Sequence, residues 1–147
     1  MLKDKIKKSL AFLLCGVITM QPGISAIAAD MPSGAVVQSG EVKIAKINPN
    51  HLQIDQTTTK SVINWNSFSV HKGGRVDFNM PSSNSSSLNR VLGSTPSSIA
   101  GQINSNGQVI LVNPNGVFLT KTGTVNSGSF IASSLNIQTS DFLNDTY

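Results

Sequence analysis

The side chains that could carry out acid–base or metal chemistry are few and far apart in this 147-residue chain. Hydrolysis or lysis of a glycan needs clustered carboxylates, and a metal site needs His, Cys, Asp or Glu at short spacing. Beyond residue 29 the candidates are Asp30, Glu41, Asp55, Asp77, Asp141, Asp145, His51 and His71. They are dispersed, and no serine lies in a nucleophile-elbow pattern. The sequence therefore predicts no enzyme, no cofactor or metal and no small-molecule substrate, with both histidines at the surface or at strand edges.

Amides, and not acids, are the side chains best placed for recognition. The tetrapeptide Asn113-Pro114-Asn115-Gly116 fits a type I turn, because its first Asn can bond back to the backbone, Pro presets φ and Gly suits the last position. Such a corner exposes amide groups that a partner can read. The apolar, β-branched run at 109–112 predicts a strand covered on both faces, and a second strand resumes at 117. We expect these two strands to lie on consecutive sides of a coil.

The elements that position this corner are predicted to be short strands separated by Gly, Asn, Ser and Thr. Strands are predicted at 36–38, 42–47, 52–55, 61–65, 76–80, 109–112, 117–120 and 130–132. No stretch has a sustained period of 3.6 residues, so helix is limited to single turns at 88–92 and 96–100. Trp65, which lies at the end of one predicted strand, is expected to fill the core and to donate its indole N–H to one acceptor. The chain is predicted to be all-β.

Among all-β folds, a right-handed parallel β-helix is predicted in preference to a sandwich or a barrel. Charged residues are only 12% of the chain, and small residues such as Ala45 and Ala132 suit a narrow interior. Asparagine recurs at expected corners, where it can adopt positive φ and form ladders: Asn50, Asn66, Asn79, Asn106, Asn115 and Asn126. The Asn106-Gly107 pair predicts an antiparallel hairpin that decorates the coil, the serine-rich stretch 82–87 predicts a surface loop, and Asn48-Pro49-Asn50 predicts a further turn.

The first 29 residues have the pattern of a secretory signal peptide. Lysines at 3, 5, 7 and 8 precede an apolar run at 10–20, and cleavage after Ala28 or Ala29 is expected. The run is short for a membrane anchor, and the residue before Cys15 is Leu14, where a lipoprotein site needs a small residue. Cys15 is the one cysteine, so the exported chain would have none and no disulfide.

Removal of this segment also changes the charge of the chain. Four of the 11 Lys and Arg residues and one of the 7 acidic residues lie in it, which leaves a net charge of about +1. The remaining basic residues are scattered, so the sequence argues against nucleic-acid binding.

Four segments together resemble the two-partner secretion domain of the filamentous-haemagglutinin family, its N-terminal haemagglutination-activity domain. They are residues 107–117 around the Asn-Pro-Asn-Gly turn, 63–68 (Ile-Asn-Trp-Asn-Ser-Phe), 88–93 (Leu-Asn-Arg-Val-Leu-Gly) and 128–135 (Gly-Ser-Phe-Ile-Ala-Ser-Ser-Leu). Their order and spacing match across roughly residues 36–137. The resemblance also supports the solenoid prediction, since the chain has no exact internal period. We expect residues 30–147 to be one such domain, shortened at its C-terminus, with the segment 141–147 forming no capping rung and leaving an open edge.

The resemblance implies a function and a location. Such domains begin large exported adhesins, haemolysins and toxins of Gram-negative bacteria. In the periplasm they are recognised by the POTRA domains of an outer-membrane β-barrel transporter, and at the cell surface they nucleate β-helix folding. The expected recognition residues are Asn113, Pro114, Asn115, Gly116, Asn64 and Trp65. A host-cell partner is expected only through a region downstream. The alternatives are a β-helix that binds or cleaves carbohydrate and a stand-alone surface adhesin.

Overall fold

A computed structural model describes residues 30–147, which form twelve strands and one short helix. The expected signal peptide, residues 1–29, lies outside the described residues. In chain order the elements are β1 (Val36–Ser39), β2 (Val42–Asn48), β3 (His51–Gln56), β4 (Lys60–Trp65), β5 (Arg75–Asn79), β6 (Ser86–Val91), β7 (Ser97–Ile99), β8 (Gln102–Ser105), β9 (Gln108–Val112), β10 (Val117–Leu119), β11 (Thr124–Asn126), β12 (Ser129–Ser133) and α2 (Thr139–Leu143).

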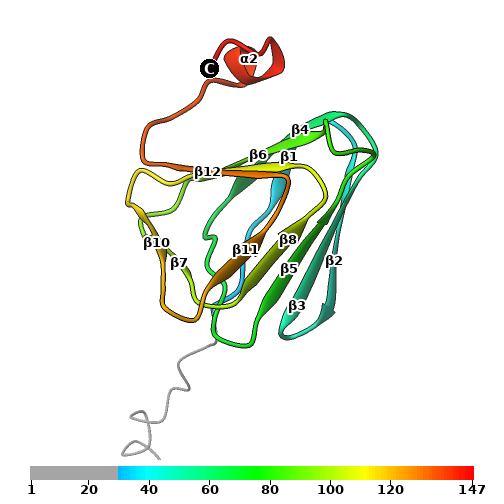
Figure 1. Ribbon diagram of the computed structural model, residues 1–147. Helices are drawn as coiled ribbons and strands as arrows, with labels where there is room; N and C mark the ends of the chain where they lie inside the picture. Colours follow the sequence, from blue (N-terminus) through cyan, green and yellow to red (C-terminus); the bar gives the residue numbers. More distant parts are fainter. Residues whose placement is uncertain (1–29) are drawn as a thin grey trace, which may run out of the picture.

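The strands form the three sides of a coil that makes about four turns (Figure 1). One side is the sheet β1-β4-β6-β9-β12, the second is β11-β8-β5-β3-β2, and the third is the pair β10-β7. Each chain pass crosses the sides in the same order, so neighbouring strands from β3 onward are parallel. The prediction of an all-β parallel β-helix is confirmed, and β9 and β10 lie on consecutive sides as expected.

Successive turns of the coil differ in length. In one sheet His51 aligns with Arg75, Arg75 with Gln102 and Gln102 with Thr124, and these three spacings are all different. Extra residues are accommodated in the corners, because the hydrogen-bonded strands must stay in register. The sequence therefore has no fixed period although the structure is a solenoid.

The N-terminal residues cap the first turn. β1 pairs antiparallel with β4, β2 pairs antiparallel with β3, and Ser33 forms an antiparallel bridge with Ser67. All three sides of the first turn are thus covered, which protects otherwise open strand edges. The turn at Asn48-Pro49-Asn50 joins β2 to β3, and the amide N of Asn50 donates to Oδ1 of Asn48 at 2.9 Å. The antiparallel decoration is therefore N-terminal.

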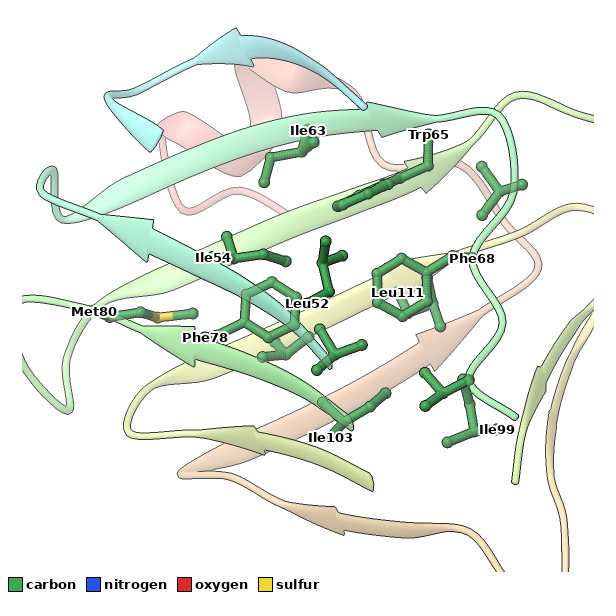
Figure 2. Close-up of a cluster of buried hydrophobic side chains, with 14 residues drawn as sticks. Leu52, Ile54, Ile63, Trp65, Phe68, Phe78, Met80, Ile99, Ile103 and Leu111 are labelled. Atoms are coloured by element: carbon green, nitrogen blue, oxygen red, sulfur yellow. The ribbon is translucent and has the colours of Figure 1, made fainter. Parts of the chain in front are cut away.

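The interior of the coil is filled by apolar side chains from all three sides (Figure 2). Leu52 and Val76, in register on β3 and β5, are buried one above the other, and Ile103 continues this column on β8. Trp65 packs edge-on against Phe68, with ring centroids 5.3 Å apart. Fully burying aliphatic or aromatic side chains of this size stabilises a fold by about 1.5–3 kcal/mol each.

A buried polar network crosses the same interior. The Oγ atom of Ser61 donates to Oε1 of Gln56 at 2.6 Å and lies 3.0 Å from Oγ of Ser87. Asn89 accepts the indole N–H of Trp65 at 3.0 Å and donates to backbone and side-chain oxygens of Ser87. Trp65 is 2% exposed. The expectation of a core tryptophan with one hydrogen-bond acceptor is confirmed.

Several local predictions are wrong. The segments expected to form helical turns are strands β6 and β7, and Ser86 and Ser87 of the expected serine loop are buried in β6. The Asn106-Gly107 pair makes no hairpin, because β8 and β9 belong to different sheets. Asparagines do not use positive φ at the corners, since Asp145 is the one non-glycine residue with positive φ in the described chain. Strand β11 was not predicted, and β8 was expected only as one arm of that hairpin.

Candidate functional site

The four segments singled out in the sequence meet at one corner of the coil. Each segment includes the end of β4, β6, β9 or β12 and continues into the corner where the chain leaves the first sheet. We call the column formed by residues 66–67, 92–93, 113–116 and 133–135 the motif corner. Its levels are linked by hydrogen bonds: the amide N of Gly93 donates to the carbonyl O of Asn66 at 3.1 Å, and that of Asn113 donates to the carbonyl O of Ser133 at 2.9 Å.

The side chain of Asn113 is completely enclosed in this column. Its Nδ2 atom donates to the carbonyl O of Thr95 and to Oγ of Ser97, both at 3.0 Å. Its Oδ1 atom accepts from the backbone N of Asn115 at 2.9 Å and from Nδ2 of Asn115 at 3.0 Å. With 0% exposure and all four bonds satisfied, Asn113 ties its own turn to the turn before it.

The rest of the tetrapeptide turns the chain and faces solvent. Gly116 donates its N–H to the carbonyl O of Asn113 at 2.9 Å and has φ of +106°, a conformation that favours glycine. Pro114 and Asn115 are exposed, and Nδ2 of Asn115 donates to the carbonyl O of Gly93 at 2.8 Å. The predicted turn is present, and the side-chain amides of Asn113 and Asn115 form hydrogen bonds to each other and to the turn before.

Two shallow grooves flank the motif corner, and Leu92 stands between them. One, of about 230 Å³, is lined by residues that include Val36, Asn64, Trp65 and Leu92. The other, of about 380 Å³, is lined in part by Asn64, Leu92 and Pro114. Leu92 is 70% exposed, and Leu135, in the same column, is 78% exposed.

The structure thus brings the six predicted recognition residues into one region but gives them different surroundings. Asn113 and Trp65 are buried, Asn64 is half-buried, and Pro114 and Asn115 are exposed. Asn64 accepts a hydrogen bond from Nε of Arg90 at 3.1 Å. Sequence reasoning did not single out Leu92, because its exposure depends on the corner following β6, which was expected to be helical.

A second polar cluster lies on the outer face of β3, β5 and β8. Asp77 accepts from Nε of Arg75 at 2.8 Å and from Nδ2 of Asn104 at 2.9 Å, and its Oδ2 is 2.8 Å from Nε2 of His51. Burial opposes ionisation of Asp77, but these hydrogen bonds outweigh it and hold the pKa of Asp77 below its usual range. The expectation of an isolated His51 is therefore wrong, because strands distant in sequence are neighbours in the sheet.

This polar cluster is an ion-pair network with its hydrogen bonds satisfied. Nearby, Asp55 accepts from Nδ2 of Asn79 and Nε2 of Gln53, and these bonds likewise lower the pKa of Asp55. Within residues 30–147 there is no group of three or more His, Cys, Asp or Glu side chains positioned to hold a metal ion. In the same range, no helix has the length and apolar character needed to span a membrane.

Comparison with known proteins identifies related sequences and a related fold. The profile of a family described as "TPS secretion domain" matches residues 28–147. Two heme/hemopexin-binding proteins of Haemophilus influenzae are 36% and 32% identical to the chain, over 83% and 74% of its length. The chain spans only 14% and 12% of these two relatives. The crystal structure of the HMW1 secretion domain from Haemophilus influenzae superposes with a TM-score of 0.73 and 31% identity, over 78% of this chain and 30% of that one.

Proposed function

The chain belongs to the TPS secretion domain family of two-partner-secretion exoproteins, and from this premise we propose that its motif corner is the surface that its transporter reads. A domain of this kind is the export signal of an exoprotein and works through a dedicated transporter. The proposal concerns which residues of this chain make that contact. The alternative of a carbohydrate-binding or carbohydrate-cleaving β-helix is not favoured.

The observation that carries the proposal is the stacking of four separate segments in one column. Residues 66–67, 92–93, 113–116 and 133–135 come from four different turns, and backbone and side-chain hydrogen bonds join them. A corner that recurs at each turn gives a partner a continuous surface along the coil axis. The exposed apolar side chain of Leu92, which lines both grooves, gives a partner apolar surface to bury.

The six predicted recognition residues then divide into two roles. Pro114 and Asn115, with Asn64 beside them, are accessible and can contact a partner of the folded domain. Asn113 and Trp65 are enclosed and act by holding the corner and the core in place. Gly116 acts through the backbone conformation of the turn.

The proposed export path begins with residues 1–29, which direct the chain to the periplasm as a signal peptide. There the POTRA domains of an outer-membrane β-barrel transporter bind the domain, and the chain then crosses to the surface of a Gram-negative cell. A parallel coil pairs strands from distant parts of the sequence and so folds slowly, and in a longer exoprotein this would leave the chain beyond the domain time for export before it folds. Growth of the coil turn by turn outside the cell would oppose backward movement.

We assign no catalytic role to the domain. Its relatives are named for heme and hemopexin binding, and this chain covers a small part of them. An adhesive, haemolytic or heme-binding activity, and any contact with host cells, is therefore proposed only for a longer exoprotein in which such a domain is one part.

A titration of the mature chain, residues 30–147, against the periplasmic region of its transporter tests the proposal. Leu92→Ala should weaken binding at least tenfold, because it removes the apolar anchor at the motif corner, whereas its unfolding midpoint should barely change. The matched control is Ile47→Ala, which truncates another exposed aliphatic side chain, 53% exposed, on β2 of the other large sheet. If both variants bind the transporter region with the same affinity as the parent chain, the recognition surface does not lie at the motif corner.

A further inference from the structure

The last residues of the chain fold back over the outside of the coil. After β12, residues 137–147 return across the sheet β1-β4-β6-β9-β12 and include the helix α2 (Figure 1). Phe142 of α2 is 0% exposed and packs against that sheet. We call residues 137–147 the clasp.

The surface beneath the clasp is a row of apolar side chains that crosses all four turns. Val62 aligns with Leu88, Leu88 with Ile110 and Ile110 with Ile131, so each turn contributes one outward side chain to the row. The first three are completely buried, although they lie on the outer face of the coil. We call these four side chains the outer row. Val62, Leu88 and Ile110 are buried because the clasp covers them, and Ile131 is half-buried.

Polar side chains on either side of the outer row hold the clasp backbone. The Nζ atom of Lys60 donates to the carbonyl O of Phe142 at 3.1 Å and of Leu143 at 2.9 Å, and it lies 2.7 Å from Oδ1 of Asp145. On the other side, Arg90 donates through Nη1 to the carbonyl O of Ile137 at 3.3 Å and through Nη2 to Oγ1 of Thr139 at 2.8 Å. The bonds from Lys60 satisfy carbonyl groups at the C-terminal end of the helix that would otherwise lack partners.

The clasp and the interior of the coil are two separate apolar clusters. Phe142 packs with Val62, Leu88, Ile110 and Val112, and none of these belongs to the inner cluster shown in Figure 2. The strands of the coil also make all their ladder hydrogen bonds among themselves. A helix of five residues is too short to be stable alone, so the clasp is ordered only where it is docked.

We propose that the clasp opens and closes as a unit on an intact coil, and that opening uncovers the outer row as a continuous apolar surface. Regions held by few buried contacts open with smaller free energies than the core of a protein. The clasp depends on one buried aromatic side chain and a few hydrogen bonds, whereas the coil has a large inner core. The twelve described strands also precede the clasp in the chain, so these turns of the coil can form before the clasp is available to cover them.

Native-state hydrogen exchange on the mature chain tests this device. The clasp is reported by the bonded amides of Phe142, Asn144 and Thr146, and the coil by the strand amides of β5 and β8. In the parent chain the clasp amides should exchange much faster than the coil amides. Exchange of both sets at one rate would overturn the proposal.

Two matched variants should each speed hydrogen exchange in one cluster and leave the other cluster unchanged. Phe142→Ala should speed exchange of the clasp amides about a hundredfold or to the unprotected limit, with the amides of β5 and β8 unchanged. Val76→Ala, in the inner cluster, should speed the coil amides and leave the clasp amides unchanged. Unfolding of the whole chain by Phe142→Ala, or equal effects of both variants on both sets, would show a single cooperative unit. Lys60→Met, which removes the ammonium and keeps the aliphatic stem, should speed clasp exchange about tenfold; no effect would contradict the role given to Lys60.

Discussion

Replacing Asn113 by aspartate tests what the enclosed amide of the motif corner contributes to the fold. The variant keeps the oxygen that accepts from Asn115 but exchanges the Nδ2 donor for a second oxygen. The hydroxyl of Ser97 can rotate and donate to that oxygen, but the carbonyl O of Thr95 loses its donor and faces a negative charge. Since the site is 0% exposed, no water can take over the lost bond.

The expected cost at pH 7 is about 2–4 kcal/mol, because leaving a buried polar group unpaired costs about 1–3 kcal/mol and a buried charge adds to it. Burial disfavours the charged form of a carboxyl, so the folded variant should bind a proton more tightly than its unfolded chain does. Its stability should therefore fall as the pH rises above about 4 and recover on acidification, when the protonated carboxyl can donate to Thr95.

Urea denaturation followed by the fluorescence of Trp65, the one tryptophan, measures this effect at pH 7 and at pH 5. The matched control is Asn115→Asp, which makes the same chemical change at an exposed position and should cost about 1 kcal/mol with little pH dependence. If Asn113→Asp is as stable as the parent chain at pH 7, or if acid destabilises it further, the enclosed amide does not hold the corner as described.

Three further changes test other parts of the fold. Asn89→Ala leaves the indole N–H of Trp65 without an acceptor and opens a void, so the urea midpoint should fall by an equivalent of about 2–4 kcal/mol; a change below about 0.5 kcal/mol would contradict the role of the polar network. Asp77→Asn removes a carboxylate whose pKa is lowered in the fold. The stability that this carboxylate contributes is present above about pH 4 and is lost as the pH falls through the folded pKa. The difference in the free energy of unfolding between variant and parent chain should therefore be largest near pH 6 and shrink below about pH 4. Gly93→Ala places a Cβ atom 2.1 Å from the carbonyl O of Asn66, so thermal unfolding should show that the free energy of unfolding falls by about 1–3 kcal/mol. An unchanged midpoint would mean that the backbone of the corner can shift to admit the methyl group.

The strands that sequence reasoning found are those with apolar, β-branched residues, such as β9, and those it missed are polar. Ser86, Ser87 and Asn89 lie in β6, where the inner ones pair with one another and with Trp65. Such side chains are tolerated in the core only because partners from other turns satisfy them. Those partners are distant in the sequence, so local pattern could not show that β6 is a buried strand.

The Asn106-Gly107 pair was misread for a related reason. As a local signal it favours a hairpin, but both polar groups of the Asn106 side chain bond the backbone of Met80 in the turn before, at 2.8 Å and 2.7 Å. A Cβ atom at Gly107 would lie 2.5 Å from the carbonyl O of Ser85, so glycine is needed there for close approach between turns. Tertiary contacts decide the direction of the chain at this corner.

The recognition residues were chosen from motifs, and the motifs do share one place in the fold. What the sequence could not give is which of their side chains are accessible. Asn113 and Asn115 have similar local surroundings in the sequence, yet one is enclosed by the preceding turn and the other faces solvent. Leu92 was not chosen because its exposure depends on the corner that follows β6, and that segment was expected to form a helical turn.

Site-directed photocrosslinking tests the central claim most directly. The one natural cysteine, Cys15, lies in the expected signal peptide, so a cysteine introduced into residues 30–147 is unique. A photoreactive group would be attached to Leu92→Cys at the motif corner or to Ile47→Cys on β2, and each protein mixed with the transporter's periplasmic region. The account predicts crosslinks from position 92 and few from position 47. Crosslinks from position 47 with none from position 92 would contradict it.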